Sequence, residues 1–413
     1  MLSCLASHGL STLFLPQLSI STDSVLARLP PKLQNHVRAS FVAAQAAVAN
    51  GVCPKTANSK DSHWSVWCAF CAQLGLDPLL RGVRDPIPFL QIFAHDYREG
   101  IIAPSQNRVR ADYISAVLHS VASAFLRVGT PDPRKAPDFK IDHRLTQMLR
   151  CWRKTDPPSA RVRPIPITLI TTLLNLAYGA PTPSASACAF ADIICLAFFF
   201  LLRPGEYTGT TSDEAAFSLD DIRFHLGTRR LCNQRALTRE LEAATSVSLY
   251  FTTQKNQRKG DVISHGRSTH PLCCPVRAAI RLMLVHRLWF AHPHRHFDGT
   301  TVFASYYLHD TPHRIRASDV TNRLRFAADL CAHSTGLTRA DVSARSLRAG
   351  GAMALLCGQV DTDDIKLLGR WHSDAMMRYL HQDCRPVMER MAKKMFNHGS
   401  YSFLPNQATV PFL

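Results

Sequence analysis

One tyrosine and two arginines near the C-terminal end of the chain have the types and the spacing for chemistry on a phosphate. Arg345 and Arg348 belong to the run Arg-Ser-Leu-Arg-Ala-Gly-Gly, and Tyr379 lies thirty-one residues after Arg348. A phenol with a pKa of about 10 becomes a nucleophile only where cations stabilise the phenolate and the charge that develops on the phosphate. We therefore predict that Arg348 holds a phosphate that Tyr379 attacks, and that other parts of the chain supply further cations.

The first of these cations is Arg203, which follows a long apolar run and precedes a Pro-Gly pair. Pro and Gly end helices, so Arg203 is predicted at a buried helix end, where a charge needs a partner. Glu206 lies three residues further on and can fix the guanidinium toward a ligand. The alternative is that the two residues form only a structural salt bridge.

The second cation is Lys255, at the tip of a predicted β-hairpin whose turn is Asn-Gln-Arg-Lys-Gly. An ammonium on a hairpin can reach a reacting group as a proton donor. Arg258 and Lys259 lie in the turn itself and are predicted to meet backbone phosphates. The alternative for all three is solvated surface.

Composition favours a polyanionic partner. The 413 residues include 48 Lys and Arg against 31 Asp and Glu, a formal net charge of +17. Nucleic acid is the leading candidate, although anionic membranes and ribosomes also attract basic proteins. The hydrophobic share of 46% supports a globular chain of two or three domains. The longest apolar run is too short to span a bilayer, and thirteen scattered cysteines predict reduced thiols in an intracellular compartment.

No metal is predicted. Cys68 and Cys71 have the spacing of a metal or redox pair, but they lie in a helical pattern without a second pair at zinc-site distance. They are interpreted as a buried structural pair. His292, His294 and His296 could bind a metal, and are interpreted as a solvated loop.

Proline-rich segments divide the chain. We expect a partly disordered leader at 1–50, weakly similar to a transit segment, a helical domain at 51–157, a larger domain at 158–400 and a tail at 401–413. Apolar spacing predicts helices in the first domain at 62–76, 86–99, 105–128 and 143–154. Their polar faces are basic, and Arg108 and Arg110 are predicted to contact a DNA backbone; ordinary solvated faces are the alternative.

In the larger domain, helices are predicted at 166–178, 189–202, 275–290 and 317–335, and strands at 222–226, 247–254 and 262–265. The fold class is therefore mainly α with one small antiparallel β-sheet. Another helix is expected to carry Arg348 together with Gly350 and Gly351. These glycines permit a close approach, either by a DNA backbone or by a neighbouring helix.

The order of these residues resembles the tyrosine recombinase (phage integrase) family. Arg203 in Leu-Leu-Arg-Pro-Gly-Glu-Tyr matches the family's first catalytic arginine, and Lys255 matches its hairpin lysine. Arg348 matches the second arginine, Trp371 in Leu-Gly-Arg-Trp the histidine-or-tryptophan position, and Tyr379 the nucleophile. Glu206 matches an acidic residue that often accompanies the first arginine. The amino-acid sequences of the motifs are most similar to those of recombinases of eukaryotic mobile elements.

This resemblance implies a helical core-binding (SAM-like) domain, followed by a catalytic domain that cuts and rejoins double-stranded DNA through a 3′-phosphotyrosyl bond. It implies no metal and no other cofactor. It also implies a homo-oligomer, a tetramer on paired DNA sites, and a nuclear location if the source is eukaryotic.

Two departures from the family pattern leave other functions open. Arg345 stands where the family usually has histidine, and an arginine is a poor base at neutral pH. The spacing from Trp371 to Tyr379 is one residue shorter than is usual in bacterial members. The alternatives are a catalytically decayed, mobile-element-derived DNA-binding protein and a type IB topoisomerase-like enzyme.

Overall fold

The computed structural model describes residues 26–52, 54–157, 163–208, 216–252 and 260–371. The chain divides into two compact units, Met1–Ser159 and Ala160–Leu413, and each is described by itself. Lys255, Arg258, Lys259 and Tyr379 lie outside the described residues. Among the helices that are described, none is long and apolar enough to cross a membrane.

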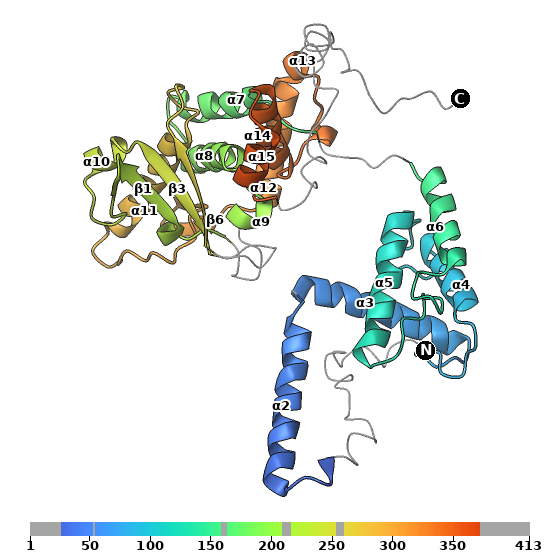
Figure 1. Ribbon diagram of the computed structural model, residues 1–413. Helices are drawn as coiled ribbons and strands as arrows, with labels where there is room; N and C mark the ends of the chain where they lie inside the picture. Colours follow the sequence, from blue (N-terminus) through green and yellow to red (C-terminus); the bar gives the residue numbers. More distant parts are fainter. Residues whose placement is uncertain (1–25, 53, 158–162, 209–215, 253–259, 372–413) are drawn as a thin grey trace, which may run out of the picture. The chain divides into compact units, whose positions relative to one another are not determined.

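Unit 1 is built mainly of helices (Figure 1). They are α2 (Pro31–Asn50), α3 (Pro54–Gln73), α4 (Ile87–Arg98), α5 (Ala111–Arg127) and α6 (His143–Thr155). Trp67 of α3 and Phe93 of α4 are fully buried, with their rings edge to face and their centroids 5.0 Å apart. This arrangement suits aromatic rings better than a face-to-face stack, and it anchors the core of the unit.

Helix α5 begins at Ala111, so the helix predicted from residue 105 begins six residues too early. The residues before it form turns instead: the side chain of Asn107 donates to the carbonyl of Ser105 at 2.8 Å. Asp156, just after α6, accepts the Ala111 N–H at 2.7 Å and pairs with the buried Arg98 of α4 at 2.7 Å. The turn residues and this long-range cap set the start of the helix. Neither feature can be recognised from the spacing of apolar residues.

Helix α2 occupies much of the segment expected to be a partly disordered leader. Six alanines lie within its twenty residues, and Pro31 stands at its first position, where a fixed φ favours helix formation. Its own composition therefore explains the helix at residues 31–50.

Unit 2 surrounds one buried helix, α8 (Ala185–Phe199), in which every residue from 189 to 198 is buried. Figure 1 shows α8 between the larger sheet and the helices that follow it at the C-terminal end of the described chain. The other helices are α7 (Ile167–Tyr178), α9 (Pro204–Tyr207), α10 (Thr238–Glu242), α11 (Pro275–Phe290), α12 (Ala317–Leu330), α13 (Ala332–Thr335), α14 (Ser346–Cys357) and α15 (Thr362–Gly369).

The larger sheet has four antiparallel strands in the order β2-β1-β3-β4. The strands are β1 (Ile222–Leu226), β2 (Arg229–Arg230), β3 (Ser246–Phe251) and β4 (Asp261–Gly266). A separate antiparallel pair, β5 (Ser305–Leu308) and β6 (Thr311–Arg314), makes a second sheet where only one was expected. The sequence of β6, Thr-Pro-His-Arg, lacks the apolar alternation that would have predicted it. The predicted class, mainly α with a small antiparallel sheet, is confirmed.

Gly350 and Gly351 allow α14 to pack tightly within the unit. A Cβ on Gly351 would lie 2.3 Å from the carbonyl oxygen of Phe198 in α8, and one on Gly350 would lie 2.4 Å from that of Ile165. Both obstacles are backbone atoms, which cannot turn aside as a side chain can. Of the two interpretations of these glycines, the structure supports close helix packing.

Candidate active site

The site is built where α8 ends. The chain leaves the helix through Phe200 and Leu201, and Leu201 has the left-handed φ of 50°. The last carbonyls of a helix have no partner within it and carry the negative end of its dipole, so they attract cations. Arginine side chains from α14 and from the end of α15 bind there, beside Arg203.

Arg203 and Glu206 form the ion pair that their spacing predicts. Glu206 is buried in α9, and its Oε1 accepts from Nη1 of Arg203 at 2.7 Å while its Oε2 accepts from the Arg203 backbone N–H at 2.8 Å. Both bonds run from Arg203 to Glu206, and together they fix the arginine at the N-terminus of the short helix. The Arg203 side chain is 27% exposed, so it has a route to solvent that its carboxylate partner lacks.

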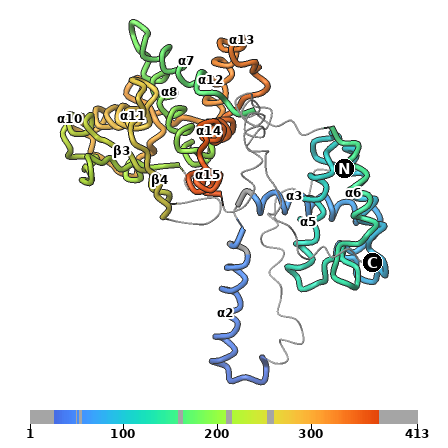
Figure 2. Tube along the Cα trace, turned by 45° about the horizontal axis from the view of Figure 1, so that its top comes forward, coloured from blue at the N-terminus to red at the C-terminus, as the bar shows by residue number. Residues whose placement is uncertain are grey.

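Arg348, in the first turn of α14, is only 2% exposed. It donates from Nη1 to the carbonyl of Leu201 and from Nη2 to that of Gly369, so it joins the C-terminal ends of α8 and α15. Figure 2 shows α14 and α15 following one another beside α8. The negative end of the α15 dipole therefore stabilises this guanidinium, together with the Leu201 carbonyl in the turn after α8.

Trp371 covers Arg348. The ring lies 4.0 Å from the Arg348 Cζ, a cation–π contact, and the indole is thereby held over the guanidinium. Gly369 permits this arrangement, because a Cβ there would lie 1.7 Å from a ring carbon of Trp371. Trp371 was matched to the histidine-or-tryptophan position of the family, and in this structure it packs on Arg348, which was predicted to bind the phosphate.

Arg370 is a member of the site that the sequence analysis missed. It is 4% exposed, and its Nη2 pairs with Oε2 of Glu206 at 2.9 Å. Its Nη1 donates to the carbonyl of Phe200 at 3.3 Å. The only sequence signal for it was its place beside Trp371 in Leu-Gly-Arg-Trp.

Burial lowers the pKa of Arg370, as does the charge of Arg203, while the Glu206 carboxylate opposes both effects. The backbone of Arg370 has the left-handed φ of 56° and ends α15, a position that usually belongs to glycine. A non-glycine residue in this conformation is strained by roughly 1–3 kcal/mol, which the surrounding contacts must offset.

Arg345 does not join this group. It lies just before α14 and is exposed, and its backbone N–H donates to the hydroxyl of Ser343 at 3.2 Å. Its side chain has no ion pair among the residues that the structure describes. The structure therefore brings together Arg203, Glu206 and Arg348, and leaves Arg345 at the surface.

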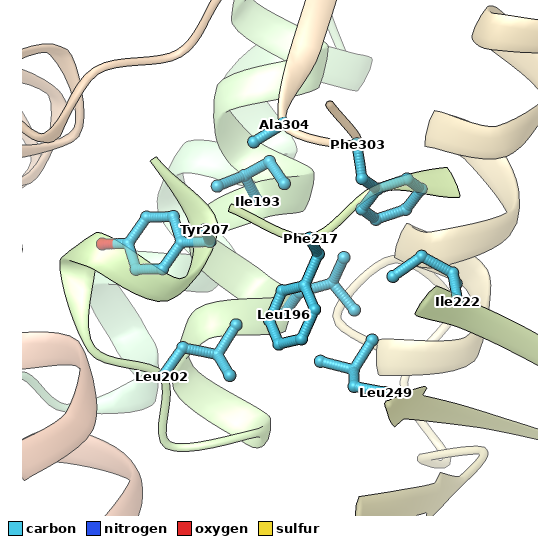
Figure 3. Close-up of a pocket in the computed structure, with 9 residues that line it drawn as sticks. All are labelled: Ile193, Leu196, Leu202, Tyr207, Phe217, Ile222, Leu249, Phe303 and Ala304. Atoms are coloured by element: carbon cyan, nitrogen blue, oxygen red, sulfur yellow. The ribbon is translucent and has the colours of Figure 1, made fainter. Parts of the chain in front are cut away.

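A small apolar cavity lies in the core of unit 2 (Figure 3). Leu202 and Tyr207, on either side of the Arg203 turn, border a cavity of about 10 Å³ together with Leu196, Phe217 and other core residues. That volume is about the room one water molecule needs, so the cavity is a packing defect and not a ligand site. Tyr207 is no candidate nucleophile, since burial, and then the neighbouring Glu206 charge, raise the pKa of its phenol.

The facing ends of β3 and β4, between which Lys255 falls in the sequence, lie beside the site. Strand β3 ends at Phe251, whose ring lies 3.9 Å from the Cζ of Arg370, and β4 begins at Asp261 opposite Phe251. The Gly260 N–H closes this end with a 2.9 Å bond to the Phe251 carbonyl. Arg370 thus contacts the base of the hairpin as well as Glu206.

The remaining predicted residues lie in unit 1. Arg108 is exposed and its Nε lies 3.3 Å from Glu99, while Arg110 is half-buried and precedes α5. Cys68 and Cys71 lie on α3, where burial raises the pKa of their thiols to about 11 and about 12. No group of three metal-binding side chains occurs in the part of the chain that is described.

No protein-family model and no curated protein matches the chain. Among solved structures, a λ integrase dimer bound to a COC′ core site is similar at 13% identity and a TM-score of 0.46, covering 84% of this chain and 96% of that one. The Tn1549 transposon integrase with a circular intermediate DNA is similar at 11% identity and a TM-score of 0.45, covering 81% of this chain and 99% of that one. XerA recombinase is similar at 12% identity and a TM-score of 0.34, covering 86% of this chain and 97% of that one.

Proposed function

We propose that this chain is a site-specific DNA recombinase of the tyrosine recombinase type. The observation that carries the proposal is the meeting of Arg203 and Arg348, far apart in the sequence, at the carbonyl end of α8, with Glu206 fixing the first of them. A site built from several guanidinium groups suits a phosphodiester, because planar guanidinium groups match its oxygens. The net charge of +17 supports a nucleic-acid partner.

In the proposed reaction, the Tyr379 phenolate oxygen attacks a DNA phosphorus and the bond from phosphorus to the 5′ oxygen breaks. Lys255 gives a proton to the departing oxygen, which leaves as a 5′-hydroxyl, and the 3′ phosphate remains on the tyrosine. Arginine charge stabilises the pentavalent transition state. The 5′-hydroxyl of a second strand then reverses the step and joins the strands without net hydrolysis.

Arg203 and Arg348 have different parts in this proposal. Arg203 reaches solvent, so it contacts the phosphate first. Arg348 is engaged by two carbonyls and covered by Trp371, so its direct contact with phosphate requires the indole to leave its place. Arg345, exposed at the start of the same motif, has the room to contact DNA and adds positive charge.

The proposal extends to the partners. Arg108 and Arg110 of unit 1 contact the backbone of double-stranded DNA, and copies of the chain pair as a tetramer across two sites. Because the motifs resemble those of recombinases of eukaryotic mobile elements, the proposal extends to an origin in such an element and, if the source is eukaryotic, to a nuclear location.

Covalent trapping tests the proposed chemistry. DNA that the chain retains from a random-sequence pool is rebuilt with a nick, so that the cleaved fragment diffuses away and rejoining is blocked. Wild type is expected to give a covalent adduct that Tyr379→Phe abolishes and Tyr306→Phe, a control on β5, retains. Salt-sensitive DNA binding without any adduct would overturn the proposal in favour of a decayed DNA-binding protein. Relaxation of supercoiled DNA by a monomer would instead favour the topoisomerase-like alternative.

A further inference from the structure

Glu206 lies between two arginines. Its Oε1 accepts from Arg203, and its Oε2 accepts from both the Arg203 backbone and Arg370. The carboxylate is 5% exposed, so water screens its charge weakly. With Arg203 alone, the buried pair would have no net charge and would attract a phosphate poorly.

Arg370 alters this balance. Two guanidinium groups against the Glu206 carboxylate leave a net charge of +1 among these three side chains, and Asp261 at the start of β4 adds a negative charge that acts on Arg370. Because Arg370 is buried and Arg203 is partly exposed, the surplus charge faces solvent on Arg203. We propose that Arg370 is a positioning residue of the phosphate site, which takes up the charge of Glu206 and leaves Arg203 with a positive charge for the phosphate. This inference rests on the proposed function and deepens it.

The surroundings of Arg370 are built for this role. The carbonyls of Phe200 and Leu201 lie 3.3 Å and 3.5 Å from its two terminal nitrogens, and the ring of Phe251 covers its guanidinium. These contacts hold the group in one orientation, with one nitrogen on Glu206. They also offset the strain of a left-handed backbone that glycine would adopt without strain.

A purely structural role makes a different prediction. If Arg370 served only to end α15 and fill its space, removing it would cost stability whatever residue stood at position 206. If it balances the Glu206 carboxylate, the damage should depend on that carboxylate. The two roles therefore separate in a double-mutant cycle.

The experiment compares wild type, Arg370→Met, Glu206→Gln and the double variant in adduct formation on the nicked duplex at saturating protein. We expect Arg370→Met to slow the step by roughly tenfold or more, and Glu206→Gln in the same chain to restore part of that loss, a coupling within the range of residues in one ion-pair network. Arg281→Met is the matched control, because it removes an arginine from the buried ion pair with Asp192, which lies on α8 away from the site. Thermal unfolding of each variant checks the fold.

A double variant as slow as Arg370→Met, or an Arg370→Met chain as fast as wild type, would overturn the inference while the proposed function stands. If wild type forms no adduct, the proposed function has failed, and the four chains are compared in DNA affinity at fixed salt. There the charge balance predicts weaker binding by Arg370→Met and recovery in the double variant. Equal affinities would overturn the inference on its own.

Discussion

Replacing Arg348 with methionine is expected to destabilise unit 2, apart from any effect on chemistry. The guanidinium donates to two buried carbonyls, those of Leu201 and Gly369, and each hydrogen bond from a charged donor contributes roughly 1.5–3 kcal/mol. The cation–π contact with Trp371 adds roughly 0.5–2 kcal/mol. Burying a methionine instead of a charge offsets part of this sum, so we expect the free energy of unfolding of unit 2 to fall by about 3 kcal/mol.

Urea unfolding followed by circular dichroism, with the thiols kept reduced, measures this loss. At the slopes usual for domains, about 3 kcal/mol moves the midpoint of the unit 2 transition by roughly 1 M or more. Arg345→Met is the matched control, because Arg345 belongs to the same motif but is exposed, and its midpoint should stay near that of wild type. If both variants unfold at the same urea concentration, the buried placement of Arg348 is wrong.

The other predictions concern packing, pH and salt. Gly351→Ala should lower the free energy of unfolding, measured in urea, by about 1–2 kcal/mol, because overpacking against a carbonyl of α8 outweighs the gain in helix propensity. Gly205→Ala is the control: it has open space around it and should leave the free energy of unfolding unchanged. Asp156 accepts a hydrogen bond from Arg98 of α4, and this bond lowers the pKa of the Asp156 carboxyl. Asp156→Asn should therefore destabilise unit 1 above about pH 5, with the difference vanishing as pH falls through that lowered pKa; a difference that persists at lower pH contradicts this reasoning. Arg108→Ala and Arg110→Ala should each reduce the slope of log affinity against log salt by about 0.9, and an unchanged slope removes that residue from the DNA interface.

The sequence predicted those parts of the site in which neighbouring residues determine one another. Arg203 and Glu206 are three residues apart around a Pro-Gly turn, so their ion pair follows from local geometry. The strands β1, β3 and β4 alternate or are rich in β-branched residues, and their positions were predicted closely. Short strands without such a pattern, such as β6, were missed.

Long-range contacts were the parts that local patterns could not predict. The covering of Arg348 by Trp371 depends on the absence of a side chain at Gly369, and the start of α5 depends on Asp156, 45 residues away. Neither contact leaves a periodic signal, because each joins elements that only the folded chain brings together.

Arg370 and Trp371 show how two neighbouring residues can take different places in one site. Trp371 was singled out by its residue type, and Arg370 was not. Side-chain direction decides between them: the left-handed backbone at Arg370 turns the chain so that Arg370 points at Glu206 and Trp371 lies on Arg348. A change of backbone handedness at one residue exchanges the directions of its neighbours, and residue type alone does not reveal it. The tryptophan therefore covers Arg348, and the residue before it pairs with Glu206.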